Sequence, residues 1–329
     1  MRVFGSGVAK AGASRLVITS ALLALAAIAI GCGGDADKPA RRQWTMVLIG
    51  GLSREEFYIT MNCGAQEEAR RDGVDLQFRA PALFDAEHQT PILDDAVASR
   101  PDAILIAPTD SVAMRAPIKR AVDAGIKLIL VDTTLENPDP AVSQIASDNY
   151  RGGQMAAQTL SELMGESGLV YVINSQRTIS STNARVEGFR DEAHKLGLDV
   201  IGQGLDRDNP VAASTLVRRT LRRHPDLKGI FGTNLLSAEG AANGLRDAGR
   251  RDVMMVGFDA GPLQVEQLQQ GVVQALIAQQ PAEIGARGVR EAVAALEGRK
   301  VDAQVSTGFV PITRETPHKN MDAQYVARC

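Results

Sequence analysis

Residues 143–157, Ser143-Gln-Ile-Ala-Ser-Asp-Asn-Tyr-Arg-Gly-Gly-Gln-Met-Ala-Ala157, decide how the rest of the chain is organised. The segment predicts a short strand, a polar break and then a helix. Asp148 or Asn149 can cap that helix, because a short side-chain oxygen accepts a hydrogen bond from a free first-turn amide. Gly152 and Gly153 lie inside the helix, where each glycine costs roughly 1 kcal/mol relative to alanine. Such a cost makes sense if another backbone passes close by.

Strands and helices alternate before this segment, and the same alternation begins again after it. The segment is therefore predicted to be the first crossing between two similar α/β lobes, with the function in the cleft between them. At 329 residues, with 44% hydrophobic and 23% charged residues, the chain is large enough to bury two cores.

A series of short apolar runs predicts strands, and Thr45–Leu52 is continuous enough to be buried on both faces of a parallel sheet. Helical patterns separate the runs, so right-handed crossovers and parallel sheets are expected. The predicted strands are 45–52, 75–80, 103–107, 127–131, 142–146, 169–173, 200–205, 229–233, 253–258, 273–278, 303–306 and 309–312. The predicted helices are 55–72, 86–99, one that ends at 125, 150–164, 183–196, 210–223, 237–248, a short one after 259, and 282–296.

Residues 1–31 are predicted to be a signal peptide, since basic residues precede an apolar run over 16–30 that is short for a membrane span. Cys32 follows a small residue, and this pattern resembles a bacterial lipobox, in which the cysteine is lipidated. Residues 32–43 would then be the lipidated end and a flexible tether. An ordinary signal peptide with an incidental cysteine is the alternative, and an apolar transmembrane anchor is a further one.

Two cysteines remain, Cys63 and Cys329. Cys63 lies in a helical pattern, where a buried, inert thiol is expected. A disulfide between the two is the alternative in an oxidising compartment, and the sequence does not decide between them.

Composition and motifs argue against several functions. The 36 basic and 39 acidic residues give a net charge of −3, so no electrostatic surface for nucleic acid is expected. The chain has no Gly-x-Ser-x-Gly elbow, no Gly-x-x-x-x-Gly-Lys phosphate loop and no Cys-x-x-Cys pair. Its four histidines are scattered, without the i,i+4 spacing of a metal site. We therefore expect neither an enzyme nor a metal or cofactor site.

Several short motifs, each weak alone, occur in an order and at spacings that together are specific. From Thr45 to about Thr313 the chain resembles the type I periplasmic sugar-binding proteins, the family of ribose-binding protein. The motifs are Ala107-Pro-Thr-Asp110, Ala124-Gly-Ile126, Ile145-Ala-Ser-Asp-Asn149 with Gly152-Gly153, Arg185-Val-Glu-Gly-Phe189, His224-Pro-Asp226, Val256-Gly-Phe-Asp259 and Ile277-Ala-Gln279.

The resemblance implies two doubly wound parallel-sheet lobes joined by three strands, with crossings near Ala146, Gln280 and Gly308. The N-terminal lobe would comprise residues 44–146 plus 280–308. The C-terminal lobe would comprise residues 147–279 plus 309–329. Ligands of open α/β sheets bind outside the carboxyl ends of the strands. Sugar hydroxyls pair there with amides and carboxylates, and the apolar ring face lies on an aromatic side chain.

Family ligand positions carried over to this chain give a ligand-binding set in that cleft. Thr133 and Asn183 stand where the family has arginine, and Asp208 falls near an aromatic position. The pocket is therefore expected to be more acidic than one built for ribose, so ribose itself is in doubt. The implied set is Glu55, Phe57, Tyr58, Asp132, Thr133, Asn183, Asp208, Asn234, Asp259 and Gln279.

Structural roles are the alternatives for some of these residues. Phe57 and Tyr58 could belong to the helix core, although adjacent residues face different ways. Asp259 could cap the following helix, and Glu55 could be a solvated first-turn acid. Arg185, outside the set, is expected to form a structural ion pair.

The resemblance implies an extracytoplasmic solute-binding lipoprotein, in the periplasm or at the cell surface. We expect a monomer that binds a sugar or polyol and delivers it to the permease of an ABC transporter. A sensory component that signals to a chemoreceptor or histidine kinase has the same fold and is the alternative. A transcription regulator of this fold would need a helix-turn-helix where this chain has its predicted signal and tether.

Overall fold

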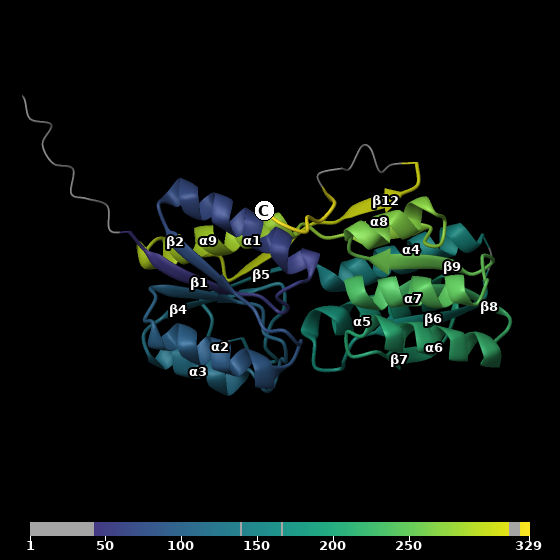
Figure 1. Ribbon diagram of the computed structural model, residues 1–329, viewed down its shortest axis with the longest axis horizontal. Coiled ribbons are helices and arrows are strands. Elements are labelled where there is room, and N and C mark those ends of the chain that lie inside the picture. The colour runs from purple at the N-terminus through teal and green to yellow at the C-terminus, as the bar shows by residue number, and fades with distance from the viewer. Residues whose placement is uncertain (1–42, 139, 166, 316–322) are drawn as a thin grey trace, which may run out of the picture. The chain divides into compact units, whose positions relative to one another are not determined.

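The computed structural model describes residues 43–138, 140–165, 167–315 and 323–329. Their strands form two six-stranded sheets, one in each lobe (Figure 1). In the N-terminal lobe all strands are parallel, in the spatial order β11-β5-β4-β3-β1-β2. These are β1 (Thr45–Ile49), β2 (Asp75–Arg79), β3 (Ala103–Ile106), β4 (Lys127–Val131), β5 (Ser143–Ser147) and β11 (Gln304–Thr307).

The sheet of the C-terminal lobe has the order β12-β10-β9-β8-β6-β7, and only its edge strand β12 is antiparallel to its neighbour among the described pairings. Its strands are β6 (Leu169–Asn174), β7 (Asp199–Leu205), β8 (Leu227–Gly232), β9 (Met254–Phe258), β10 (Ala275–Ala278) and β12 (Val310–Thr313). The central strands of both sheets are almost wholly buried, which explains their continuous apolar sequences.

Helices cover both faces of each sheet. In the N-terminal lobe, α1 (Glu56–Asp72) packs with α9 (Pro281–Leu296), and α2 (Ala86–Ala98) packs with α3 (Arg115–Asp123). In the C-terminal lobe, α4 (Asn149–Met164) packs with α5 (Ser180–Lys195). The remaining helices, α6 (Pro210–Arg223), α7 (Leu235–Asp247) and α8 (Pro262–Gln269), pack in sequence on one another. Every predicted strand and helix is present, and the predicted fold of two doubly wound lobes is confirmed.

The chain passes between the two sheets at three places. It leaves β5 at Ser147 to enter α4, leaves β10 at Ala278 to enter α9, and crosses Gly308 between β11 and β12. At the first crossing Asp148 caps α4, because its side chain accepts a hydrogen bond from the Arg151 amide at 3.2 Å. Residues 143–157 are therefore the first crossing, as predicted.

The glycines of α4 allow a close approach to α5. A Cβ atom on Gly153 would lie 2.0 Å from the carbonyl oxygen of Arg185, and one on Gly188 would lie 1.9 Å from that of Tyr150. Neither contact is sterically possible, so glycine is required at both positions. For Gly153 the predicted close backbone is α5, which carries Arg185 to the edge of the cleft. Gly152 instead faces the rings of Phe258 and Phe309, so the prediction of a close backbone is wrong there.

The tail of the chain departs from two expectations. Cys63 and Cys329 form a disulfide with a Cα–Cα distance of 5.3 Å, so the expectation of a buried thiol at Cys63 is wrong. Cys63 belongs to α1 of the N-terminal lobe, whereas β12, the last strand before the tail, belongs to the sheet of the C-terminal lobe. The tail end thus reaches the N-terminal lobe, although residues 309–329 were expected in the C-terminal lobe.

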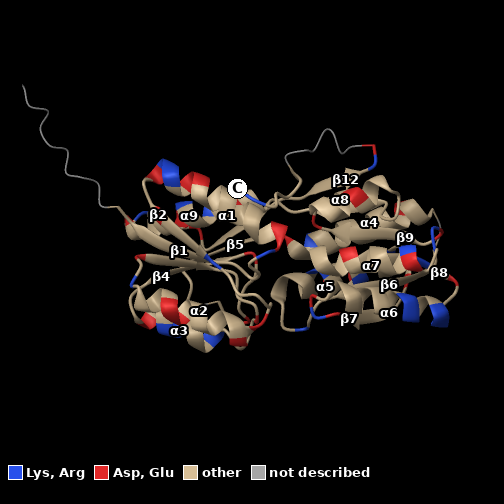
Figure 2. Cartoon of the chain, in the orientation of Figure 1, with Lys and Arg blue, Asp and Glu red and all other residues tan. Residues whose placement is uncertain are grey.

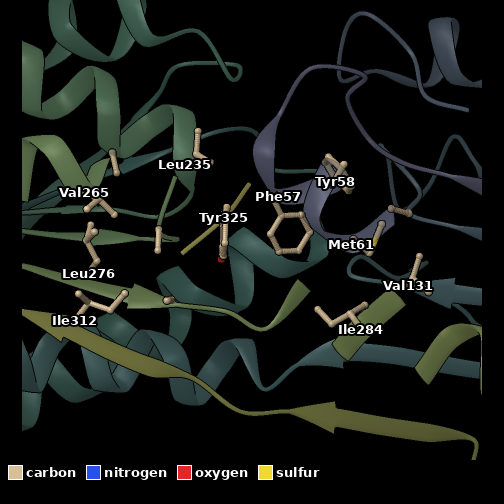
Figure 3. Packing of buried hydrophobic residues seen from close by; sticks show 14 of the residues in the cluster. Phe57, Tyr58, Met61, Val131, Leu235, Val265, Leu276, Ile284, Ile312 and Tyr325 are labelled. Atoms are coloured by element: carbon tan, nitrogen blue, oxygen red, sulfur yellow. The ribbon is translucent and has the colours of Figure 1, made fainter. Parts of the chain in front are cut away.

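The largest apolar cluster continues through both lobes. Figure 3 shows Tyr325 between Phe57 of α1 on one side and Leu235 and Val265 of the C-terminal lobe on the other. Tyr325 is 4% exposed. The tail therefore supplies part of the apolar core where the two lobes meet.

Acidic and basic residues are interspersed over the helices in the view of Figure 2. Residues 1–42, which hold the predicted signal peptide, Cys32 and all but the last residue of the tether, lie outside the described residues. Within the described part of the chain, no helix combines the length and the apolar character that a membrane span needs.

Candidate functional site

A polar cavity lies between the lobes, at the carboxyl ends of their strands. Nine of the ten predicted ligand residues line it. Asn183 does not line it, since its amide donates to the Arg177 carbonyl and its oxygen accepts from Asn174. The lining residues are Glu55, Phe57, Tyr58, Phe84, Asp132, Thr133, Ile179, Ser181, Thr182, Arg185, Asp208, Asn234, Asp259 and Gln279.

The N-terminal lobe supplies aromatic rings and two carboxylates, those of Glu55 and Asp132. Phe57 and Tyr58, from the first turn of α1, are both buried, and their rings meet edge to face with centroids 5.1 Å apart. The Tyr58 hydroxyl donates to Oδ2 of Asp132 at 2.8 Å. Thr133 donates from its hydroxyl to the Pro108 carbonyl at 2.8 Å, which fixes the loop after β4. Both aromatic residues therefore pack in the core and line the cavity.

The C-terminal lobe also supplies carboxylates to the cavity. Asp259 follows β9 and is 2% exposed. Its Oδ1 accepts a hydrogen bond from Nε2 of Gln279 at 2.7 Å and another from the Tyr325 hydroxyl at 2.8 Å. The residue that caps α8 is Gly261, so the alternative role of Asp259 as the cap is wrong.

Asp208 and Asn234 form a further polar pair. Nδ2 of Asn234 donates to Oδ1 of Asp208 at 2.6 Å. The oxygen of Asn234 accepts from the Ser237 amide at 3.1 Å and so caps α7. One side chain thus stabilises a helix terminus and orients a carboxylate of the cavity.

Three of the cavity carboxylates lie on backbone in the left-handed region. The φ angles are +63° at Asp132, +55° at Asp208 and +80° at Asp259. Non-glycine residues adopt this conformation at an energetic cost, and such strain gathers at functional sites. At Asp132 and Asp259 the turn follows the end of a central strand directly, which places the carboxylate at the cavity.

Arg185 is the only fully buried cation among the described residues of the cavity. Its guanidinium stacks on the Phe258 ring, 3.8 Å from the centroid. Nε donates to Asn149 and Nη1 to the Thr233 carbonyl, each at 2.8 Å. Among the described residues it forms no ion pair, so the expected structural ion pair is wrong. Arg185 instead presents its positive charge to a cavity rich in carboxylates.

Burial and mutual repulsion raise the pKa values of these carboxylates. Burial raises the pKa of Asp132 to about 6, although the Arg185 guanidinium and the Tyr58 hydrogen bond oppose the shift. Burial, followed by repulsion from Asp208 and Asp259, raises the pKa of Glu55 well above its usual value. The pKa of Asp208 is raised by burial as well. A site with these pKa values holds protons readily, and a carboxyl group in either form can pair with hydroxyl groups.

Some buried polar atoms at the cavity have no hydrogen-bond partner among the described residues. They are Oε1 of Gln279, Oγ1 of Thr182 and Oδ2 of Asp208. A buried polar atom without a partner costs about 1–3 kcal/mol. A ligand with several hydroxyl groups would satisfy these atoms. No cluster of histidine, cysteine or acidic side chains in the described residues has the arrangement of a metal site.

Among the described residues, three hydrogen bonds join the lobes at the cleft. The Ser111 amide donates to the Thr178 carbonyl at 2.9 Å, and the Thr134 amide donates to Oγ of Ser180 at 2.8 Å. The Gln176 side chain donates to the Phe84 carbonyl at 3.0 Å. The lobes are thus in contact around the cavity.

Sequence reasoning missed some lining residues. Ser181 and Thr182 lie in the first turn of α5, which begins three residues earlier than predicted. The register of that helix start would have indicated them. Phe84 and Ile179 lie in loops, where the sequence has no periodic pattern that would indicate which side chains face the cavity.

Two α/β lobes with a polar cavity at their strand ends, crossed three times by the chain, define a solute-binding protein. A sequence model described as the periplasmic binding protein domain matches residues 46–300. The chain belongs to this family, and specifically to the sugar-binding, solute-binding proteins of ABC transporters. Its named relatives are binding proteins rather than enzymes, and the family is extracytoplasmic.

The ribose import binding protein RbsB of Escherichia coli is 33% identical over 262 residues, which cover 79% of this chain and 87% of that protein. A solute-binding protein from Agrobacterium vitis, bound with α-D-tagatopyranose, has a TM-score of 0.85 and 37% identity over 86% of this chain and all of that one. A second, from Agrobacterium radiobacter in complex with D-arabinose, has a TM-score of 0.82 and 25% identity over 87% of this chain and all of that one.

Proposed function

We propose that this chain is a membrane-anchored lipoprotein that captures a monosaccharide or related polyol between its lobes and delivers it to an ABC importer. The observation that carries the proposal is the set of side chains at the cavity. Carboxylates and amides converge on it from both lobes, and two aromatic rings of α1 line one side. Sugars need this combination of polar groups and apolar ring surface.

The class of sugar follows from the relatives and from the cavity. Relatives bind pentoses and hexoses according to their names. Thr133 lines the cavity in place of a family arginine, and Asn183 stands outside it. The single buried guanidinium among several carboxylates favours a sugar other than ribose.

A thermal-shift screen of the mature chain against pentoses, hexoses, amino sugars and polyols tests this function. A ligand at 100 times its Kd adds about 2.7 kcal/mol to the free energy of unfolding, which raises the melting temperature measurably. We expect a shift with a small group of stereochemically related monosaccharides, and a smaller shift with Asp259→Ala. Equal shifts in wild type and variant would place the ligand elsewhere, and no shift across the panel would contradict the function.

The lipid anchor rests on Cys32 and the apolar run that precedes it. Changing Cys32→Ser removes the sulfur that would carry the lipid, so the protein should move from the membrane fraction to the soluble fraction. The measurement is fractionation of cells that express the full chain, with Cys329→Ser as the control. A Cys32→Ser protein that remains with the membrane until detergent is added would contradict the lipid anchor.

A further inference from the structure

The last residues of the chain, 323–329, form a segment that we call the strap. At one end it is bound covalently to α1 of the N-terminal lobe through the Cys63–Cys329 disulfide, across a sequence separation of 266 residues. The Val326 amide adds a hydrogen bond to Oγ1 of Thr60 in the same helix, at 2.9 Å. The strap is therefore fixed to the N-terminal lobe at two points.

One residue earlier, the strap bonds to the other lobe. The Tyr325 amide donates to the Ala260 carbonyl at 3.0 Å, and its hydroxyl donates to Oδ1 of Asp259 at 2.8 Å. The same hydroxyl accepts a hydrogen bond from the backbone amide of Gln279 at 3.1 Å. A tyrosine hydroxyl has one proton to donate and lone pairs to accept, so both bonds form at once.

The Tyr325 ring is packed in the apolar core. It packs edge to face against Phe57, with centroids 5.8 Å apart, and is 4% exposed. Phe57 itself lines the cavity. Tyr325 does not line it, and so contacts three cavity residues from behind: Phe57, Asp259 and Gln279.

These contacts indicate a structural role for the strap at the cavity. Asp259 lies on strained backbone, with φ at +80°, and Gln279 stands at the second crossing between the lobes, directly after β10. Strained conformations persist only where surrounding contacts hold them. We propose that the strap positions Asp259 and Gln279 through Tyr325, and that the disulfide fixes the strap for this purpose. Tyr325 is then a positioning residue of the sugar site, an inference that rests on the proposed function for its effect on affinity.

The first test needs no sugar. Amide hydrogen exchange, resolved to single residues, is measured on the wild-type chain, Tyr325→Phe and Cys329→Ser. Tyr325→Phe keeps the ring and removes the hydroxyl that accepts a hydrogen bond from the backbone amide of Gln279. The hydrogen of that backbone amide should therefore exchange with solvent about tenfold faster. Cys329→Ser frees the strap, so the amides of both Gln279 and Tyr325 should exchange faster.

The matched control is Tyr150→Phe. The Tyr150 hydroxyl also donates to a carboxylate, that of Asp191 at 2.6 Å, but it lies on the exposed surface of α4 and α5. This variant should leave the Gln279 amide unchanged. Unchanged exchange at Gln279 in both Tyr325→Phe and Cys329→Ser, with circular dichroism of the native form, would overturn the positioning role.

The second test measures affinity with D-tagatose as the probe. Loss of the two hydrogen bonds of the Tyr325 hydroxyl should raise the Kd about tenfold, whereas Tyr150→Phe should leave it unchanged. A Tyr325→Phe protein with wild-type affinity would overturn the role in binding. If the wild-type chain binds no D-tagatose, that choice of sugar fails while the exchange experiment still decides whether the strap positions the two residues.

Discussion

At the residue scale, the site combines strain, burial and like charge. Asp132, Asp208 and Asp259 occupy left-handed backbone, and each accepts a hydrogen bond from a neighbouring side chain. These bonds fix each carboxylate before a ligand arrives. Such preorganisation reduces the entropy that binding would otherwise cost.

The raised pKa of Asp132 makes stability depend on pH. Its pKa is about 6 in the folded protein and about 3.9 in an unfolded chain, so the folded state keeps a proton that the unfolded state loses. The contribution of Asp132 to the free energy of unfolding is therefore present at low pH and is lost as pH rises through 6. Relative to Asp132→Asn, the wild type should lose about 2 kcal/mol between pH 4.5 and pH 7.

Urea denaturation of both proteins at the two pH values measures this difference. The pH-dependent contributions of groups that both proteins share largely cancel in this difference. The control is Asp199→Asn, which replaces an exposed carboxylate at the start of β7. A difference that stays constant or grows with pH would show that Asp132 is not protonated in the folded protein near pH 5.

The sequence predicted which residues line the cavity better than it predicted the contacts that each of these residues makes. The resemblance predicted that Asp132, Asn234 and Gln279 lie in the cleft, and all three line the cavity, because the ends of parallel strands meet at one edge. It did not predict that Asn234 would also cap a helix. The role of Tyr325 could not be predicted, since the residue lies in an aperiodic tail and its position depends on a cysteine far away in the sequence.

At the scale of elements, paired helices position the site. The α4–α5 pair carries Arg185 and Thr182, and its separation is set by Gly153 and Gly188. The sequence predicted this close approach from the energetic cost of the glycines alone. It could not predict which backbone would approach, because that depends on the tertiary fold.

Gly153→Ala tests the importance of this approach. The added Cβ would meet the Arg185 carbonyl oxygen at 2.0 Å, and because that atom is backbone the helices must separate. We expect a loss of about 1–3 kcal/mol in the free energy of unfolding, which exceeds the gain in helix propensity. Chemical denaturation measures it, with Glu162→Ala on the exposed face of α4 as the control. A stabilised Gly153→Ala protein would show that the helices separate at no cost.

At the scale of the whole molecule, binding is expected to depend on closure of the lobes about the three crossings. A ligand that touches both lobes binds the closed form better, and it can shift the equilibrium only by that difference in affinity. The hydrogen bonds between the lobes add to the stability of the closed form. A transporter that contacts both lobes would then distinguish the two states.

Ser180→Ala weakens this closed form without altering the cavity lining. It removes the acceptor of the Thr134 amide, which lies in the other lobe. Sugar should dissociate about three- to tenfold faster, because losing one hydrogen bond costs about 1 kcal/mol and such effects appear mainly in the dissociation rate. Stopped-flow fluorescence measures the rate, with Ser161→Ala on α4 as the control. A lower association rate with unchanged dissociation would contradict this role of the bond.

Calorimetric titration of the wild type, Asp132→Ala and Asp259→Ala, with the sugar that stabilises the wild type most, tests the central claim most directly. Each substitution removes a hydroxyl partner from a buried site, one on each lobe, so each should weaken binding at least about tenfold. Asp199→Ala, far from the cavity at the other end of β7, should bind as the wild type does. Wild-type affinity in both cavity variants, with folding intact by circular dichroism, would show that the sugar does not bind between the lobes.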